Sequence, residues 1–192
     1  MSHAASVQSE RTSTGLPTGR VAIWWFIASE IAIFGGAVAC YILLRMRHPE
    51  WGAAARHTAT SIGAVNTVVL LTSSLFAVLA DSAAARGDGR RAGRFLLLTS
   101  LGGLAFLAIK AFEYTREIQH GFTPVTSLFW SFYYLMTGLH AAHVLAGMVA
   151  MLAVASGARR GQSVHRVEFV AIYWHFVDVV WIFLFPLLYL AS

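Results

Sequence analysis

The sequence predicts an all-α integral membrane protein, a bundle of five transmembrane helices. Of its 192 residues 57% are hydrophobic and only 12% are charged, whereas about a quarter are charged in a soluble domain. Five apolar runs are each long enough to cross the roughly 30 Å hydrocarbon core of a bilayer as a helix. These runs cover about residues 21–45, 59–81, 94–115, 125–156 and 168–190. We therefore expect one five-helix domain over residues 20–192, preceded by a flexible tail at residues 1–19.

The first run carries one acidic side chain in its middle. Glu30 lies ten residues into this run, about 15 Å along a helix that rises about 1.5 Å per residue, and so near the middle of the membrane. Two interpretations stay open. Glu30 either exchanges protons or contacts lipid, or it is a protonated acid that forms a hydrogen bond with a neighbouring helix.

The second run carries a stripe of polar side chains, and the third run is the weakest of the five. The stripe indicates helix–helix packing and consists of Asn66, Thr67, Thr72, Ser73 and Ser74. In the third run only the segment from Phe95 to Ile109 is free of charge. It spans the bilayer only if Lys110 snorkels and Glu113 lies near an interface. The last two residues are also spaced for an intrahelical ion pair.

The fourth and fifth runs each carry two polar side chains one helical turn apart. They are His140 with His143, and His175 with Asp178. A carboxylate at this depth costs several kcal/mol by insertion scales, so Asp178 should hold a proton or face a partner in the bundle interior. A metal or haem site needs convergent geometry that nothing else in the sequence supports. We therefore expect no metal, and an interhelical polar lock of Glu30 with these four residues.

The arginines predict the orientation. Nine of them lie in the N-terminal tail and in the second and fourth loops, and four lie on the opposite side. The positive-inside rule then places the N-terminus in the cytoplasm and the C-terminus outside. Because the basic residues sit between apolar runs, they indicate topology and not a nucleic-acid partner.

Several function classes lack sequence support. The sequence has no phosphate-binding glycine loop, nucleophile elbow, zinc-protease helix or CxxCH haem attachment motif. Its one cysteine, Cys40, excludes a disulfide framework and a cysteine-rich metal site within the chain. The chemistry that remains is proton exchange or lipid contact inside the membrane.

The segment Tyr173-Trp-His-Phe-Val-Asp-Val-Val-Trp181 resembles the signature of the last helix of subunit III of haem-copper respiratory oxidases. Four further matches follow the family's order. They are Trp25-Phe-Ile-Ala-Ser-Glu30, Asn66-Thr-Val-Val-Leu-Leu-Thr-Ser, Glu113-Tyr114 followed by Gly121, and Thr137-Gly-Leu-His-Ala-Ala-His-Val144. The resemblance covers about residues 20–190 and is closest to the five-helix bacterial form.

The resemblance implies an accessory subunit without a redox centre of its own. In this family the subunit packs against the catalytic subunit I and other oxidase subunits, binds phospholipid, and supports proton uptake and turnover stability. Haem and copper are then expected in the partner subunits, and the location is the bacterial inner (cytoplasmic) membrane. Glu30 matches the family's carbodiimide-reactive glutamate. Its other motif positions correspond to Asn66, Glu113, Tyr114, His140, His143, Glu168, Tyr173, Trp174, His175, Asp178 and Trp181.

Three alternatives stay open at this point. Lys110 ahead of Glu113-Tyr114, with Phe185-Pro-Leu-Leu-Tyr-Leu190, resembles the related accessory protein of bacterial nitric oxide reductase. A stand-alone membrane haem protein is an alternative of another class. Its ligands would be His140, His143 and His175. A proton-coupled transporter could relay protons through Glu30 and Asp178, but paired broken helices and clear repeats are missing.

Overall fold

The computed structural model describes residues 18–162 and 164–190, and five long helices run through them. Each is long and apolar enough to cross a membrane, which confirms the predicted number of spans. The helices are α2 (Thr18–Arg47), α4 (Thr60–Ala85), α5 (Gly89–Gln119), α6 (Leu128–Arg159) and α7 (Arg166–Phe185). Two short elements, α3 (Trp51–Ala55) and the π-helix η1 (Pro186–Leu190), lie near one end of the bundle. Most of the predicted N-terminal tail lies outside the described residues.

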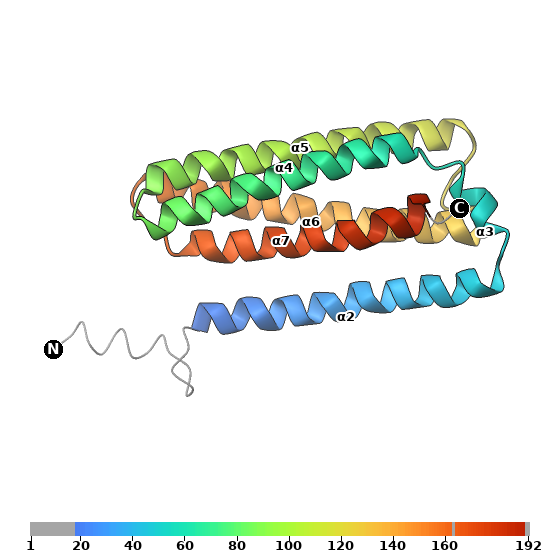
Figure 1. Cartoon of the computed structure of the whole chain (residues 1–192), viewed down its shortest axis with the longest axis horizontal. Helices are drawn as coiled ribbons and strands as arrows, with labels where there is room; N and C mark the ends of the chain where they lie inside the picture. Colours follow the sequence, from blue (N-terminus) through green and yellow to red (C-terminus); the bar gives the residue numbers. More distant parts are fainter. Residues whose placement is uncertain (1–17, 163, 191–192) are drawn as a thin grey trace.

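Helices α4 to α7 form a four-helix bundle, and α2 lies alongside it as a separate layer (Figure 1). Within the described chain α2 packs against α7 and α6. In the most apolar 18-residue stretch of α2 only 17% is buried. In the corresponding stretches of the other four spans 28 to 50% is buried. Most of the surface of α2 is therefore left for lipid or for another protein.

The connections explain where the helices begin and end. The α4–α5 loop turns at Gly87, whose φ of 76° favours glycine. Directly after it, the carboxylate of Asp88 accepts a hydrogen bond from the backbone N–H of Arg91 and caps the start of α5. Ser127 caps α6 in the same way, through the N–H of Trp130. These caps satisfy N–H groups that have no partner inside the helix.

The third span corrects one sequence-based expectation. Helix α5 is 31 residues long, and Lys110 lies inside the bundle with only 2% of its surface exposed. The expectation that Lys110 snorkels to the membrane surface is therefore wrong. Its ammonium group stays buried because it donates hydrogen bonds to side chains of α5, α6 and η1.

The core of the bundle combines large aromatic side chains with close helix contacts. Trp130, Trp174 and Trp181 are all at most 2% exposed. A Cβ on Gly103 would lie 2.7 Å from the ring of Trp174, and one on Gly147 would lie 3.0 Å from the same ring. These two glycines thus let α5 and α6 close around the indole.

Candidate functional site: buried polar contacts between the helices

Glu30 on α2 faces His143 on α6. The His143 Nε2 lies 3.0 Å from the Glu30 Oε2, and the His143 Nδ1 lies 2.8 Å from the carbonyl oxygen of Leu139. A carbonyl oxygen only accepts, so Nδ1 carries a proton. The contact between Nε2 and the carboxyl group then requires one further proton, held by either partner. The pair is therefore neutral overall and contains one proton that can move between an acid and a base.

Two neighbouring side chains hold this pair in place. The ring of Phe34 lies edge-on to the imidazole of His143, with centroids 5.1 Å apart. The hydroxyl of Tyr173 on α7 donates to the backbone carbonyl of His143 over 3.0 Å. Helices α2, α6 and α7 thus meet at this one acid–base pair.

Two further polar contacts attach α2 near its ends. At the start of the helix, Arg20 forms an ion pair with Glu168 of α7 over 2.7 Å. Toward its other end, the hydroxyl of Tyr41 donates to the carbonyl of Leu187 in η1 over 3.3 Å. The contacts of Arg20, Glu30 and Tyr41 follow one another at intervals of about ten residues, or about 15 Å along the helix. They compensate for the small apolar area that α2 buries.

The polar stripe of α4 receives side chains from α7. Trp174 donates its indole N–H to the Ser73 hydroxyl over 3.1 Å, and Trp181 donates to Thr67 over 3.0 Å. His175 bonds to Ser74, with 2.8 Å between Nδ1 and Oγ. The stripe therefore packs α4 against α7 through hydrogen bonds, as helix packing predicts.

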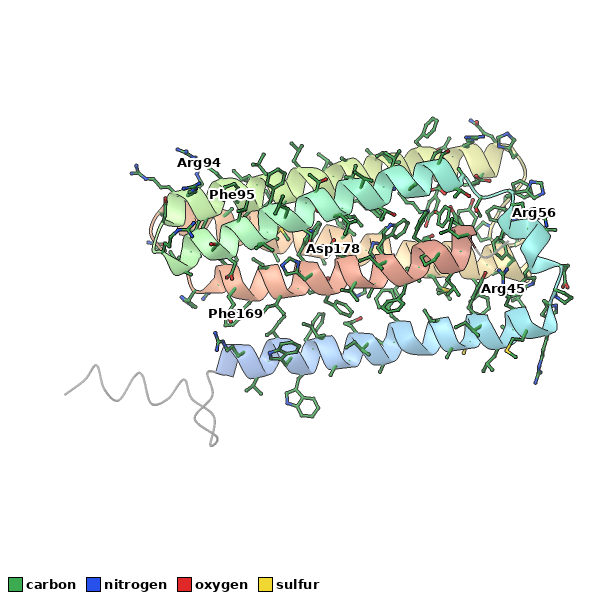
Figure 2. The ribbon with its side chains drawn as sticks, in the orientation of Figure 1. Arg45, Arg56, Arg94, Phe95, Phe169 and Asp178 are labelled. Atoms are coloured by element: carbon green, nitrogen blue, oxygen red, sulfur yellow. The ribbon has the colours of Figure 1, made fainter. Side chains whose placement is uncertain are left out.

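His140 and Asp178 are buried, and their side chains have no hydrogen-bond partner among the described residues. Both ring nitrogens of His140 and both carboxyl oxygens of Asp178 have none in the described part of the chain, and neither does the side-chain oxygen of Asn66. His140 lies between the rings of Phe106 and Trp181, at 5.3 and 5.1 Å between centroids. Figure 2 shows Asp178 about midway along the bundle. These groups are buried polar atoms that the described part of the chain leaves without a hydrogen bond.

The structure does not join these residues into the single interhelical lock that the sequence suggested. Glu30 and His143 form one contact, and His175 forms another with α4. His140 and Asp178 take part in neither. No group of three or more His, Cys, Asp or Glu side chains converges within residues 18–162 and 164–190.

A second polar cluster, which sequence reasoning missed, surrounds Lys110. Its Nζ donates to Glu113 over 2.9 Å, to the Tyr133 hydroxyl over 3.1 Å, and to the Tyr189 hydroxyl. The Tyr133 hydroxyl donates to the other oxygen of Glu113 over 2.7 Å. The rings of Tyr114, Tyr133, Tyr189 and Trp181 enclose the ammonium group at 4.7 to 5.5 Å. Only the spacing of Lys110 and Glu113 was visible in the sequence.

The π-helix η1 brings Tyr189 to this cluster. Pro186 has no N–H to continue the hydrogen bonding of α7, and the chain widens into a π turn there. In that turn the Tyr189 hydroxyl reaches Lys110, while its backbone carbonyl accepts from Thr60 at the start of α4. Close by, Tyr114 bonds to Thr137 over 2.6 Å. One end of the bundle is thus closed by a continuous set of polar contacts.

The Glu30–His143 contact should contribute measurably to stability. Replacing His143 by Leu is expected to lower the free energy of unfolding by about 1–3 kcal/mol, because Glu30 then stays buried without a partner. The measurement is unfolding in mixed detergent micelles for both single variants and the double variant with Glu30→Leu. A coupling energy near zero in this cycle would show that the pair does not stabilise the fold. His120→Leu, at an exposed imidazole, is the control.

Fold and contacts together define a multi-pass membrane protein, a five-helix bundle whose helices are joined by buried acid–base and hydroxyl contacts. The family model for cytochrome c oxidase subunit III matches residues 10–192. The chain therefore belongs to the cytochrome c oxidase subunit III family.

Individual relatives agree with the family match. The chain is 35% identical over 172 residues to cytochrome c oxidase subunit 3 of Thermostichus vulcanus, covering 87% of this chain and 84% of that one. It is 36% identical over 171 residues to the subunit 3 of Corynebacterium diphtheriae, covering 85% and 83%. It also matches a heme-copper oxidase subunit I+III of Aeropyrum pernix, 32% identical over 183 residues, covering 90% of this chain and 22% of that longer protein.

Proposed function

We propose that this chain is the accessory subunit III of a bacterial haem-copper terminal oxidase of the cytochrome c oxidase type. It has no redox centre of its own, binds the catalytic subunit I and phospholipid, and supports proton uptake by the complex. It spans the cytoplasmic membrane with its N-terminus in the cytoplasm. Family membership supports the place in an oxidase, and the subunit I+III relative supports the pairing with subunit I.

The Glu30–His143 pair is the observation that carries the functional part of this proposal. Its shared proton can sit on either partner, so the proton can move between Glu30 and His143 while the pair stays neutral. Glu30 also lies on α2, the span least covered by the rest of the chain. A partner subunit or lipid that covers α2 would therefore lie close to the acid.

The contacts of His143 leave no ring nitrogen for a haem iron. Both ring nitrogens of His143 are already hydrogen-bonded, to Leu139 and to Glu30. His175 has its Nδ1 bonded to Ser74. His140 lies between two aromatic rings, and its ring nitrogens have no hydrogen-bond partner among the described residues. An iron ligand needs a free nitrogen that points at the metal. In this proposal the haem and copper of the oxidase lie in the partner subunits.

Co-purification is the direct test of the assembly. An affinity tag on this chain should isolate a stoichiometric haem-copper catalytic subunit from the native membrane. The separated chain should show no Soret band. Isolation of the chain free of any catalytic subunit, or a Soret band that stays with it, would contradict the proposal.

A substitution at Glu30 tests its role in proton uptake. In the assembled oxidase, Glu30→Gln should leave the initial turnover within about twofold and shorten the active lifetime during turnover several-fold, because an amide cannot exchange the proton. Oxygen consumption followed over many turnovers measures both quantities. Glu50→Gln, at an exposed carboxylate outside the spans, is the control. A Glu30→Gln complex with normal turnover and a normal lifetime would remove Glu30 from the mechanism.

A further inference from the structure

A pocket lined by arginines lies on the outer side of α5, at the end of the bundle where that helix begins. Its volume is about 550 Å³. The lining residues are Asp88, Arg90, Arg91, Arg94, Phe95 and Leu98. All three arginine side chains are exposed. Figure 2 shows Arg94 at this end of α5 with Phe95 beside it, whereas Arg45 and Arg56 lie at the opposite end.

The spacing along α5 places the three guanidinium groups together. Arg94 follows Arg90 and Arg91 by four and three residues, so all three share one side of the first turns. The guanidinium of Arg91 lies 5.7 Å from the centre of the Phe95 ring. That ring in turn stacks on Phe76 of α4. The floor of the pocket is thus anchored to two helices.

The pocket is divided into a cationic half and an apolar half. The segment from Phe95 to Ile109 contains no charged residue, so the apolar part of α5 begins directly after Arg94. Above this boundary, three arginines and one carboxylate leave a net charge of 3 − 1 = +2. The carboxylate of Asp88 is already used to cap α5. Among the described residues, no ion pair joins the three arginines to Asp88 or to another carboxylate.

We propose that this pocket binds the headgroup of an anionic phospholipid, whose acyl chains lie along Phe95 and Leu98. A guanidinium group binds phosphate oxygens through two parallel hydrogen bonds, and three arginines line this one pocket. Basic pockets at the cytoplasmic ends of transmembrane helices favour such lipids. The inference rests on the proposed orientation, which puts the start of α5 on the cytoplasmic side.

Charge and apolar surface together select a lipid over other anions. Inorganic phosphate would use the arginines but leave Phe95 and Leu98 without a function. A zwitterionic lipid would cover the apolar half but bring no net charge to balance the arginines. An anionic phospholipid uses both halves of the pocket.

The test uses the assembled oxidase complex, purified in detergent and titrated with defined lipids under native mass spectrometry. Phosphatidylglycerol and cardiolipin are the anionic probes, and phosphatidylethanolamine is the zwitterionic one. The variant Arg90→Gln/Arg91→Gln/Arg94→Gln should bind the anionic probes on the order of a hundredfold more weakly at its tightest site. The control removes the same charge from exposed arginines at the opposite end, through Arg47→Gln, Arg56→Gln and Arg116→Gln. The control complex should bind the anionic probes as tightly as the unchanged complex does.

Four results would overturn the proposal. They are undiminished binding in the Arg90/Arg91/Arg94 variant, an equal loss in the control, equally tight phosphatidylethanolamine binding, and complete displacement by millimolar inorganic phosphate. If the triple variant does not assemble, Arg94→Gln alone should still weaken binding about fivefold. Co-purification with the catalytic subunit is scored separately, so failure of the lipid site and failure of the proposed function are distinguishable.

Discussion

Replacing Lys110 by Met is expected to lower the free energy of unfolding by about 3–5 kcal/mol, because Glu113 is then left buried without its cation. Glu113 is fully buried and the ammonium of Lys110 is its only ionic partner within the described residues. Unfolding of the purified chain in mixed detergent micelles measures the effect. Arg116→Met removes the same charge from an exposed position on the same helix, and should change the stability by less than about 0.5 kcal/mol.

A double variant separates the ion pair from simple packing. Replacing both partners, with Lys110→Met and Glu113→Leu, should restore most of the stability, since apolar residues of similar volume commonly replace a buried pair at little net cost. The hydroxyls of Tyr133 and Tyr189, 3.1 Å apart, could still bond to each other. A double variant as unstable as the single one would show that the loss comes from packing and not from an unpaired charge.

Replacing Gly89 by Ala is the second substitution with a large expected effect, a loss of about 1–3 kcal/mol. The new Cβ would lie 2.3 Å from the backbone carbonyl oxygen of Ala158, a group that cannot rotate away. Helices α5 and α6 would have to separate where α5 begins. The same unfolding assay measures the loss.

Gly36 on α2 provides a matched control. A Cβ there meets nothing within 4 Å, so Gly36→Ala should leave the stability unchanged or raise it by up to about 1 kcal/mol through better helix propensity. Equal effects at Gly89 and Gly36 would contradict the packing argument.

The transmembrane helices could be predicted because each depends on its own composition. An apolar run of sufficient length must satisfy its backbone hydrogen bonds internally in a bilayer, and a helix does so without any partner. For this reason the predicted and observed spans agree, and even the run that contains Lys110 proved to be a long helix. The motif at Tyr173–Trp181 likewise pointed to the family that the comparisons show.

The contacts of the buried polar residues could not be predicted in the same way. Lys110 meets Tyr133 and Tyr189, which are 23 and 79 residues away in the sequence. Whether Lys110 snorkels or turns inward depends on those partners, and no local pattern contains them. Similarly, Glu30 selects His143 and not His140, because the rotation of α6 directs one imidazole toward α2 and the other toward Phe106 and Trp181.

The sequence by itself determined that this protein is a five-helix membrane bundle, where its helices run, and which residues are too polar for a lipid-facing surface. These properties follow from hydropathy and from the cost of burying charge, which act on each segment alone. Only the tertiary structure decided the partners, namely Glu30 with His143, Lys110 with Glu113 and two tyrosines, and the stripe of α4 with α7. Partner choice depends on helix rotation and close packing, which arise only when all the helices come together.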